Sequence, residues 1–346
     1  MKAAILYGRG DVRIEQIEVP RPAPGEVVLR TRVALTCGTD VKVFRRGYHA
    51  RMIRPPAVFG HEVSGTVEEL GDGVQGLETG TTVAVGNSAP CGACPYCLAG
   101  RASLCDDLQF WNGAYAQFVR IPARVVRRNL LPVEGGVGFR GAAMVEPLAC
   151  VVRGVEDCGI AAGQTVAVIG AGPIGLMLVR LARLRGAQVI AVGRNAGRLR
   201  AAAALGAAET LAVGAGDDLA ARLRAAGGGH GPDVVIEAVG LPETAEAAVR
   251  AVRKGGLVNL FAGCSTDARL VIDAQRLHYQ ELTIRSTFHH TPDSIRTAYR
   301  LIADGHVDPE TFITGEAPLD ELPSVLARLA RGSDGLKTAV LTWGRE

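Results

Sequence analysis

The pattern of hydrophobic positions changes before the middle of the chain. Up to about residue 150, apolar positions alternate or pair in short runs such as 27–33, and Pro- and Gly-rich turns at 22–25 and 71–73 separate them. This pattern is typical of a mostly β domain. Further on, apolar runs alternate with helical patterns, which predicts strands at 165–169, 188–192, 233–238 and 256–261 and helices at 195–205 and 244–252. Such alternation predicts a parallel sheet with helices on both faces.

A glycine-rich turn directly follows the strand at 165–169 and leads into an apolar helical run at 174–182. The turn, G-A-G-P-I-G, has the G-x-G-x-x-G spacing in the strand–turn–helix context that dinucleotide sites use. Gly170 would make the tight turn, Gly172 would let the backbone approach a pyrophosphate, and Gly175 would let the helix pack on the strand. Unpaired N–H groups of the first helical turn would bind the phosphates. The predicted cofactor-binding residues are Gly170, Gly172, Pro173, Ile174 and Gly175.

Composition and charge narrow the class of protein. The chain of 346 residues is long enough for two domains, and its formal net charge of +3 comes without a basic cluster. Nucleic-acid binding is therefore not expected. No apolar run approaches the roughly 18 residues of a membrane span, and residues 1–5 open a strand without a signal-peptide segment. We expect a soluble, cytoplasmic protein that acts on a small molecule and binds neither nucleic acid nor membranes.

Four of the eight cysteines lie close together, at Cys91, Cys94, Cys97 and Cys105. Four thiolates at such spacing can surround one zinc ion in the tetrahedral arrangement of a closed structural site. Pro and Gly residues interrupt the same stretch, so a lobe at about 88–106 would have little core without a metal. Clustered disulfides are the alternative, and the missing signal peptide argues against them. The spacing predicts one structural zinc.

A second set of candidate metal ligands is dispersed along the chain, at Cys37, His61, Glu62 and Glu146. Taken singly, each of these residues is as typical of ordinary packing in a protein core as of a metal ligand. Together they follow a fixed order: G-H-E at 60–62, the four-cysteine stretch, E-P at 146–147, and then the glycine turn. In this order, and over the whole chain, the sequence resembles the medium-chain, zinc-dependent alcohol dehydrogenase family.

The resemblance implies a fold and a division into domains. The fold would be α/β, with a Rossmann doubly wound parallel sheet and a mostly-β, GroES-like catalytic domain that carries a zinc lobe. Residues 1–150 would form the catalytic domain and 151–286 the dinucleotide-binding domain, and 287–346 would return to the catalytic domain. The resemblance also implies a homotetramer, or else a dimer, in which the sheet edge at 256–261 and 283–286 continues across a two-fold axis.

The resemblance further assigns a catalytic site with a second zinc ion. Cys37, His61 and Glu146 would bind this zinc and leave one position for water or substrate. Glu62 would lie behind these ligands, or would replace Glu146 as the third one. The metal would act as a Lewis acid on the oxygen of a secondary alcohol, whose hydride passes to a nicotinamide.

For several further side chains, the sequence leaves a choice between a functional and a structural role. Thr39, in the stretch T-C-G-T-D at 36–40, would relay the proton that leaves the alcohol. His49 would extend that relay to solvent, or it belongs to a surface turn. Trp111 would shape the substrate cleft, or it covers the zinc lobe. His289 and His290 would bind hydroxyl groups, or they belong to a turn that caps a helix.

The sequence favours NADP over NAD as the cofactor. Enzymes that use NAD place Asp or Glu at the end of the second strand, where the carboxylate accepts hydrogen bonds from the adenosine ribose. Here that strand ends in Gly193 and Arg194, with Arg198 one helical turn further on. A guanidinium can bind a 2′-phosphate with two parallel hydrogen bonds. The alternative is that Arg194 is one surface arginine among many.

The substrate is less well determined. The E-P-L element at 146–148 looks like the polyol, sorbitol and threonine dehydrogenase branch of the family. A polyol, sugar or cyclitol is therefore the first expectation, and oxidation of L-threonine or a similar hydroxy amino acid is the alternative. A third possibility, a zinc-free quinone reductase, is disfavoured, because the candidate metal ligands would then have no function. A nucleotide-sensing protein without catalysis is the alternative from another class, and the intact ligand set argues against it.

Overall fold

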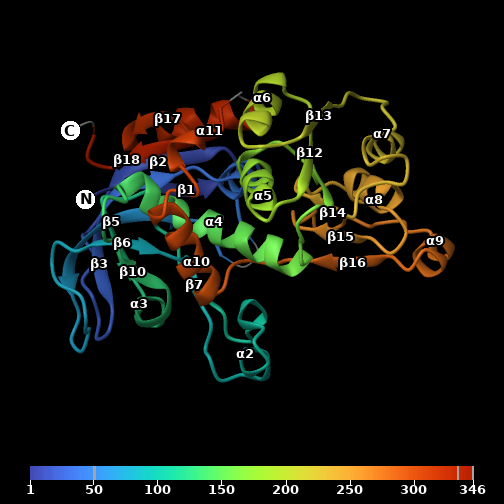
Figure 1. Cartoon of the computed structure of the whole chain (residues 1–346). Coiled ribbons are helices and arrows are strands. Elements are labelled where there is room, and N and C mark those ends of the chain that lie inside the picture. Colours follow the sequence, from blue (N-terminus) through green and yellow to red (C-terminus); the bar gives the residue numbers. More distant parts are fainter. Residues whose placement is uncertain (50–51, 333–334, 345–346) are drawn as a thin grey trace. The chain divides into compact units, whose positions relative to one another are not determined.

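The computed structural model describes residues 1–49, 52–332 and 335–344 (Figure 1). The chain forms two compact units. One combines Met1–Ala149 with His290–Glu346, and the other is Cys150–His289. The boundary between residues 149 and 150 falls inside the longest helix, α4 (Phe139–Cys158). The C-terminal segment thus belongs to the same unit as the N-terminal part of the chain.

The first unit is built mainly of β-strands. Its largest sheet has the order β10-β6-β5-β3-β18-β17, with β9 paired to β3, and a smaller sheet has the order β2-β1-β4. The strands are β1 (Lys2–Gly8), β2 (Asp11–Gln16), β3 (Val27–Leu35), β4 (Ala57–Val58), β5 (Glu62–Leu70), β6 (Thr82–Val85), β9 (Phe118–Ile121), β10 (Leu130–Pro132), β17 (Ile313–Pro318) and β18 (Lys337–Leu341). The helices are α1 (Gly38–Arg46), α3 (Ala123–Asn129), α10 (Pro292–Ala303) and α11 (Leu322–Ala330), with 3₁₀ turns η2 (Pro309–Thr311) and η3 (Leu319–Glu321).

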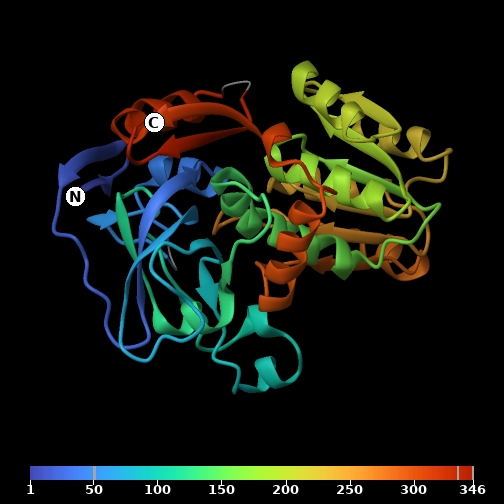
Figure 2. The ribbon, with the colours of Figure 1, turned by 60° about the vertical axis from the view of Figure 1, so that its left-hand side comes forward.

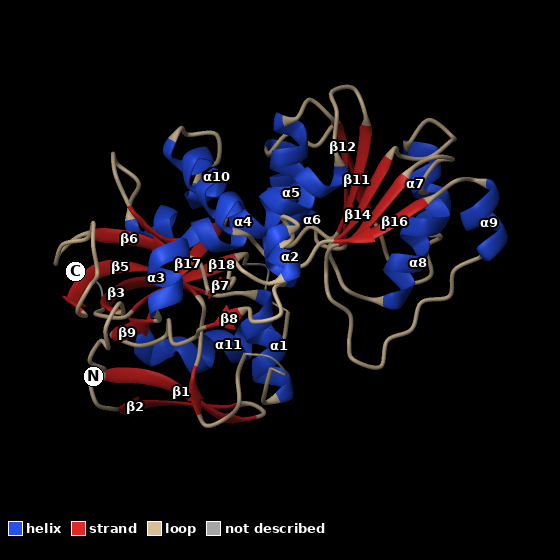
Figure 3. Ribbon diagram, turned by 90° about the horizontal axis from the view of Figure 1, so that it is seen from below, coloured by secondary structure: helices blue, strands red, loops and turns tan. Residues whose placement is uncertain are grey.

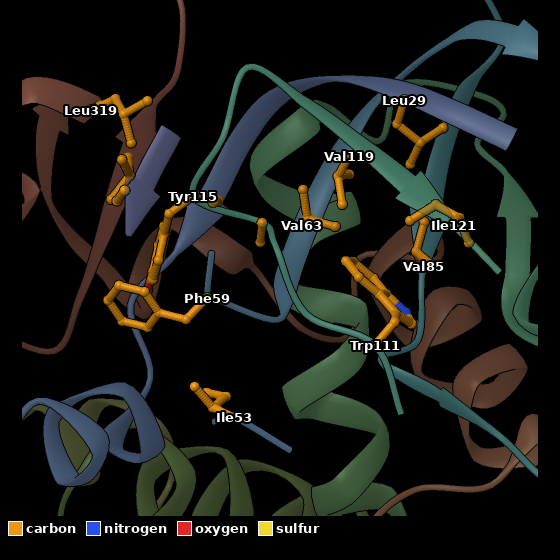
Figure 4. Close-up of a cluster of buried hydrophobic side chains, with 14 of the residues drawn as sticks. Leu29, Ile53, Phe59, Val63, Val85, Trp111, Tyr115, Val119, Ile121 and Leu319 are labelled. Carbon is orange, nitrogen blue, oxygen red and sulfur yellow. The ribbon is translucent and has the colours of Figure 1, made fainter. Parts of the chain in front are cut away.

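Strand β3 holds the larger sheet together, because it pairs antiparallel with β5, β9 and β18. Figure 4 shows Leu29 of β3, Val63 of β5, Val85 of β6 and Ile121 of β9 in one apolar cluster, in which these side chains are buried. The last strand, β18, lies beside β3 (Figure 2). In this antiparallel pair Ala339 is opposite Leu35. This pairing holds the C-terminal segment in the first unit.

The four-cysteine stretch forms a small lobe with little regular structure. It contains β7 (Ser88–Ala89) and β8 (Gln109–Phe110), which pair with each other, the short helix α2 (Pro95–Leu98) and the 3₁₀ turn η1 (Ala102–Leu104). None of the α2 side chains is buried. As the sequence suggested, this lobe has almost no apolar core of its own.

The second unit is a six-stranded, fully parallel sheet in the order β13-β12-β11-β14-β15-β16. Figure 3 shows α5 and α6 on one face of this sheet and α7 and α8 on the other. The strands are β11 (Thr165–Ile169), β12 (Gln188–Gly193), β13 (Glu209–Ala212), β14 (Val234–Glu237), β15 (Leu257–Leu260) and β16 (Thr283–Ser286). The helices are α5 (Pro173–Leu184), α6 (Ala196–Ala204), α7 (Leu219–Ala226), α8 (Pro242–Ala251) and α9 (Ala274–Tyr279). This is the strand order of a doubly wound dinucleotide-binding fold, and it confirms the predicted α/β class.

The strands and helices expected from periodicity are present, with bounds shifted by a few residues. Among the strands and helices given above for the second unit, β13, α7 and α9 were not predicted from the sequence. Strand β13 has the sequence E-T-L-A, is largely exposed and lies at the sheet edge, so it lacks the apolar pattern of the inner strands. In the part of the chain that the structure describes, no helix is long and apolar enough to cross a membrane.

Candidate active site

Cys37 stands at the junction between strand β3 and helix α1. It is the N-cap of α1, and its Sγ atom accepts a hydrogen bond from the backbone N–H of Thr39 at 3.4 Å. In the opposite direction, the Oδ2 atom of Asp40 accepts a hydrogen bond from the Cys37 backbone N–H at 2.9 Å. This reciprocal capping arrangement explains the local sequence T-C-G-T-D. Thr39 is half-buried in the first turn of the helix.

His61 directly precedes strand β5, and 4% of its surface is exposed. Gly60 before it has φ +91, and a Cβ atom there would lie 2.6 Å from the ring of Tyr115. The Tyr115 ring packs edge-on against Phe59 with centroids 5.1 Å apart (Figure 4). Glycine in the G-H-E element is therefore required both by backbone conformation and by the aromatic ring beside it.

Asp40 connects His61 to Tyr115 inside the protein. The Tyr115 hydroxyl donates to Asp40 Oδ2 at 2.7 Å, and Asp40 Oδ1 lies 3.4 Å from His61 Nδ1. Neither Oδ1 nor Nδ1 has another hydrogen-bond partner among the described residues. Burial alone would lower the pKa of His61, but the negative charges of Asp40 and Cys37 outweigh it and raise that pKa well above its usual value. Asp40 is thus placed to orient the imidazole.

Glu62, the first residue of β5, forms a buried ion pair with Lys337, the first residue of β18. The Lys337 ammonium donates to both carboxylate oxygens of Glu62, at 2.7 Å to Oε1, and to the backbone carbonyl of Thr36 at 3.2 Å. Both side chains are almost completely buried. Burial alone would lower the pKa of Lys337, but the Glu62 carboxylate outweighs burial and raises it. The ammonium stays charged and holds Glu62 in place.

These side chains fit a metal ion. One ligand atom each of Cys37, His61 and Glu62 lies within 4.8 Å of the other two. A thiolate, an imidazole and a carboxylate are donors that zinc accepts in catalytic sites, where three protein ligands leave one position open. Three of the four residues expected here therefore form this group, and Glu146 is not among them.

Glu146 lies on α4, and 4% of its surface is exposed. Burial raises its pKa to about 7, and the nearby charge of His61 opposes this shift. Its Oε1 atom is 3.7 Å from Nε2 of His290, which is also 2.9 Å from Asn87 Oδ1. Burial lowers the pKa of His290 to about 3, so this histidine is neutral at physiological pH.

The structure also places the side chains whose roles stayed open. Thr291 is the N-cap of α10 and forms a capping box with Ser294, so the capping turn expected at this point is present. Trp111 is buried in the core of the first unit, and its Nε1 atom donates to the Gly86 carbonyl at 2.8 Å. His49 pairs through its backbone with Ile53 in an isolated β-bridge.

The four cysteines of the lobe converge on one point. One Sγ atom each of Cys91, Cys94, Cys97 and Cys105 lies within 4.8 Å of the other three. Hydrogen bonds from backbone N–H groups, first that of Ala93, lower the pKa of Cys91 to about 6, whereas burial raises that of Cys97 to about 12. Four converging sulfur atoms fit a closed tetrahedral zinc site. Arg128 of α3 donates to the Cys91 carbonyl at 3.0 Å and so attaches the lobe to the sheet domain.

In the second unit, the glycine turn has the form that a dinucleotide site needs. Gly170 has φ +110, and a Cβ atom at Gly175 would lie 1.7 Å from the Gly170 carbonyl oxygen. Only glycine at 175 therefore lets α5 approach the strand so closely. A Cβ atom at Gly172 would meet nothing within 4 Å, and Gly172 is the N-cap of α5 with no side-chain cap. Open space thus adjoins the unpaired N–H groups of a helix N-terminus, where a phosphate can bind.

Gly193 ends strand β12 beside this turn. A Cβ atom there would lie 2.9 Å from the Ala171 Cβ atom, so a longer side chain does not fit without movement. Arg194 follows and is exposed, and Arg198 lies in the first turn of α6 with its backbone N–H bound to Asn195 Oδ1 at 2.9 Å. No carboxylate stands at the end of this strand.

The fold, the two groups of candidate metal ligands and the glycine turn together define a zinc-binding dehydrogenase that uses a nicotinamide cofactor. Residues 23–132 match the family model "Alcohol dehydrogenase GroES-like domain", and residues 173–304 match "Zinc-binding dehydrogenase". L-threonine 3-dehydrogenase of Bacillus subtilis (strain 168) is 32% identical over 332 residues, which are 93% of each chain. L-galactonate-5-dehydrogenase of Escherichia coli (strain K12) is 30% identical over 95% of each chain.

A solved structure agrees with these relatives. A zinc-binding dehydrogenase from Sinorhizobium meliloti 1021, bound to NADP, superimposes with a TM-score of 0.89 at 32% identity over 98% of both chains. The chain belongs to the medium-chain, zinc-dependent alcohol dehydrogenase family. It is an oxidoreductase with zinc and a nicotinamide cofactor, and it transfers hydride between a small-molecule alcohol and NAD(P). The resemblance and the activity expected from the sequence are thereby confirmed.

The sequence alone did not predict three residues around the candidate metal ligands: Asp40, Tyr115 and Lys337. Asp40 had a signal, since an acid three residues after Cys37 at a helix start predicts a capping box. Lys337 had a weaker one, because it is one of four lysines in an arginine-rich chain and lies within an apolar terminal strand. Tyr115 had no signal that pattern reasoning could use.

Proposed function

We propose that this enzyme oxidises a secondary alcohol of a polyol, sugar or cyclitol with NADP. The observation that carries the proposal is the buried group of Cys37, His61 and carboxylate side chains in a chain with an open glycine turn. The similarity to L-galactonate-5-dehydrogenase supports a polyhydroxylated substrate. The similarity to L-threonine 3-dehydrogenase favours a second candidate, oxidation of L-threonine or a related hydroxy amino acid.

In the proposed site Cys37, His61 and Glu146 hold a catalytic zinc, and Glu62 does not bind it. Both oxygens of Glu62 are bound by the Lys337 ammonium, which weakens this carboxylate as a donor to a second cation. When bound, zinc supplies Lewis-acid polarisation of the alcohol oxygen. Asp40 orients the His61 ring, because an Nδ1–H that faces Asp40 leaves Nε2 as the ligand atom.

Two further parts complete the proposed site. The Thr39 hydroxyl, in the first turn of α1, accepts the proton of the substrate alcohol and passes it on towards solvent. A second zinc, bound by the four cysteines of the lobe, is structural, because four thiolates leave no open position.

NADP preference is proposed from the end of β12. No carboxylate can accept the ribose hydroxyls of NAD there, and Ala171 leaves no room for one at position 193. Arg194 and Arg198 supply positive charge for a 2′-phosphate, and the similar Sinorhizobium meliloti dehydrogenase is bound to NADP. Arg194→Ala should lower kcat/KM for NADP by about tenfold, since a hydrogen bond to a charged group contributes about 1.5–3 kcal/mol.

The matched control for Arg194→Ala is Arg185→Ala. It removes an exposed arginine at the C-terminal end of α5, whereas the glycine turn lies at the N-terminal end of that helix. This control should change neither cofactor. If the wild type already prefers NAD, and Arg194→Ala affects both cofactors equally, the NADP assignment is wrong. Gly193→Asp is unsuitable as a test, because its Cβ atom would displace Ala171.

We further propose a homotetramer, with a dimer as the alternative. Strand β16 forms one edge of the parallel sheet and has largely exposed or half-buried side chains. Two large apolar side chains that precede β16 in the sequence, Val271 and Tyr279, are 80% and 75% exposed. Pairing of two β16 edges across a two-fold axis would satisfy the free backbone groups of this edge. A monomer in light scattering at assay concentration would contradict this.

The test of substrate class is a panel of polyols, sugars, cyclitols and L-threonine, each assayed with NAD and with NADP by absorbance of the reduced nicotinamide. The highest kcat/KM is expected for a polyhydroxylated alcohol with NADP. Cys37→Ser is the negative control, since it removes a proposed zinc ligand. Activity confined to L-threonine would establish the second candidate.

A further inference from the structure

A buried carboxylate at the end of strand β14 has no role in the proposed chemistry. Glu237 is 1% exposed, yet its side chain accepts hydrogen bonds from three groups. The backbone N–H of Val239 donates to Oε1 at 2.8 Å, and that of Gly240 donates at 2.9 and 3.1 Å to the two oxygens. The Thr244 hydroxyl donates to Oε1 at 2.8 Å. A buried carboxylate is costly unless it is bound in this way, so its presence needs a reason.

Glu237 holds together three separate segments of the second unit. Its side chain fixes the loop 238–240 and the first turn of α8, whose N-cap Leu241 provides no side-chain cap. Its backbone carbonyl accepts from the N–H groups of Phe261 and Ala262, both at 3.0 Å. The positive end of α8 further favours a negative charge at this point. These contacts make the loop 238–240 rigid.

This loop lies against the glycine turn. The Ala238 N–H donates to the Ile169 carbonyl at 2.9 Å, just before Gly170. A Cβ atom at Gly170 would lie 2.9 Å from Val239 Cγ2 and 3.2 Å from the Ala238 carbonyl oxygen. Strands β11 and β14 are neighbours at the point where the strand order reverses, and ligands of open α/β sheets bind at that point, beyond the carboxyl ends of the strands. The loop therefore forms a wall of the dinucleotide site.

We propose that Glu237 is a positioning residue for the dinucleotide: through the loop 238–240 it holds Val239 and the glycine turn in the arrangement that binds the cofactor. This inference rests on the proposed function, because it requires a dinucleotide at the turn. Val239 is 37% exposed, and it presents an apolar surface beside the turn. Glu237 itself acts through the loop and not by touching the cofactor.

The isosteric variant Glu237→Gln tests the proposal. A glutamine has one acceptor oxygen, and its NH₂ group would face one of the backbone N–H donors that the carboxylate now accepts from. The loop would then shift away from Gly170. We expect the Kd for NADPH, measured by fluorescence of the reduced nicotinamide, to rise by about tenfold or more, the factor that corresponds to roughly one lost charge-assisted hydrogen bond.

A milder second variant and a matched control accompany it. Thr244→Val removes the hydroxyl contact of Glu237 at nearly constant volume and should raise the Kd for NADPH by about threefold. Glu243→Gln, which changes an exposed carboxylate in the same first turn of α8, should leave it unchanged. For all three variants, kcat at saturating cofactor and the KM for the alcohol should stay within about twofold of the wild type, since positioning of the cofactor acts on its KM.

Two outcomes would overturn the inference. In the first, Glu237→Gln and Thr244→Val both bind NADPH as tightly as the wild type. In the second, both variants lower the melting temperature while the Kd for NADPH stays constant, and Glu237 then has a purely structural role. Failure of the proposed function looks different: the wild-type protein itself would then show no fluorescence change with NADPH or NADH. If Glu237→Gln does not fold, Thr244→Val decides, because its expected effect is small and graded.

Discussion

At the scale of single residues, the proposed metal site depends on contacts behind its candidate ligands. His61 faces Asp40 at 3.4 Å, and Asp40 is held by the Tyr115 hydroxyl at 2.7 Å and by the Cys37 backbone N–H at 2.9 Å. The Tyr115 ring also occupies the space beside Gly60 that a Cβ atom would need. One aromatic side chain thus determines both the backbone before His61 and the position of the carboxylate that orients it.

Tyr115→Phe should weaken zinc binding at the Cys37–His61 site by roughly tenfold, because loss of an outer hydrogen-bond partner typically reduces metal affinity by that order. The ring and its packing against Phe59 are kept, so the fold should survive. Competition with a chromophoric chelator measures the effect as zinc released per chain. The control Tyr7→Phe removes an exposed hydroxyl that donates to Glu15 and should release zinc like the wild type. Equal release from both variants would show that Tyr115 does not support His61.

Lys337→Met should destabilise the protein by about 3–5 kcal/mol, because it leaves the Glu62 carboxylate buried without its ammonium partner. Urea unfolding of the metal-free protein measures the change. The double variant Lys337→Met with Glu62→Gln removes both charges and should recover most of the loss. If the single variant is as stable as the wild type, the ion pair does not hold β5 and β18 together.

At the scale of elements, the cysteine lobe depends on helix α3 as well as on the proposed structural zinc. Arg128 of α3 donates to the Cys91 carbonyl, and its guanidinium occupies the space where a Cβ atom at Gly92 would lie. Arg124, one turn earlier, donates to Asp107 on the other side of the lobe. Two arginines at i and i+4 thus contact both ends of the four-cysteine stretch.

Arg128→Ala should loosen the lobe without unfolding the unit, since a hydrogen bond of this kind contributes about 1 kcal/mol. Limited proteolysis should then cut within 88–106 several times faster than in the wild type. Arg127→Ala, an exposed arginine next in the sequence, serves as the control and should leave the rate unchanged. A cleavage rate that does not differ between the two variants would mean that the metal alone holds the lobe.

At the scale of the whole molecule, the two proposed zinc sites are built on different principles. The lobe takes all four ligands from one short stretch, whereas Cys37, His61 and Glu146 come from a helix start, a strand start and the long helix α4. The lobe ligands can therefore meet by local folding alone, and the catalytic ligands meet only when the β-sheet domain has formed.

Elemental analysis of purified Cys37→Ser should show about half the zinc of the wild type, because the lobe keeps its own four thiolates. Cys264→Ser changes an exposed cysteine outside both groups and should retain all of it. Retention of the full zinc content in Cys37→Ser, together with unchanged activity, would remove Cys37 from the catalytic site.

Much of this protein is determined by sequence patterns that span few residues. The parallel strands and their helices follow from apolar periodicity, the dinucleotide turn from glycine spacing after a strand, and the cysteine lobe from four thiols within fifteen positions. Each of these signals is local, since the residues that make the structure are also neighbours along the chain. The family resemblance adds the order of these elements and the candidate ligands.

Tertiary structure alone decided what surrounds the candidate metal ligands. Tyr115 meets Asp40 across 75 positions of the sequence, and Lys337 meets Glu62 across 275. The second pairing exists because the C-terminal strand β18 returns to lie against β3, which a single sequence does not specify. The proposed choice of Glu146 over Glu62 as a zinc ligand likewise rests on a long-range contact, the ion pair between Glu62 and Lys337. Long-range pairing of strands, and not local propensity, brings these charges together.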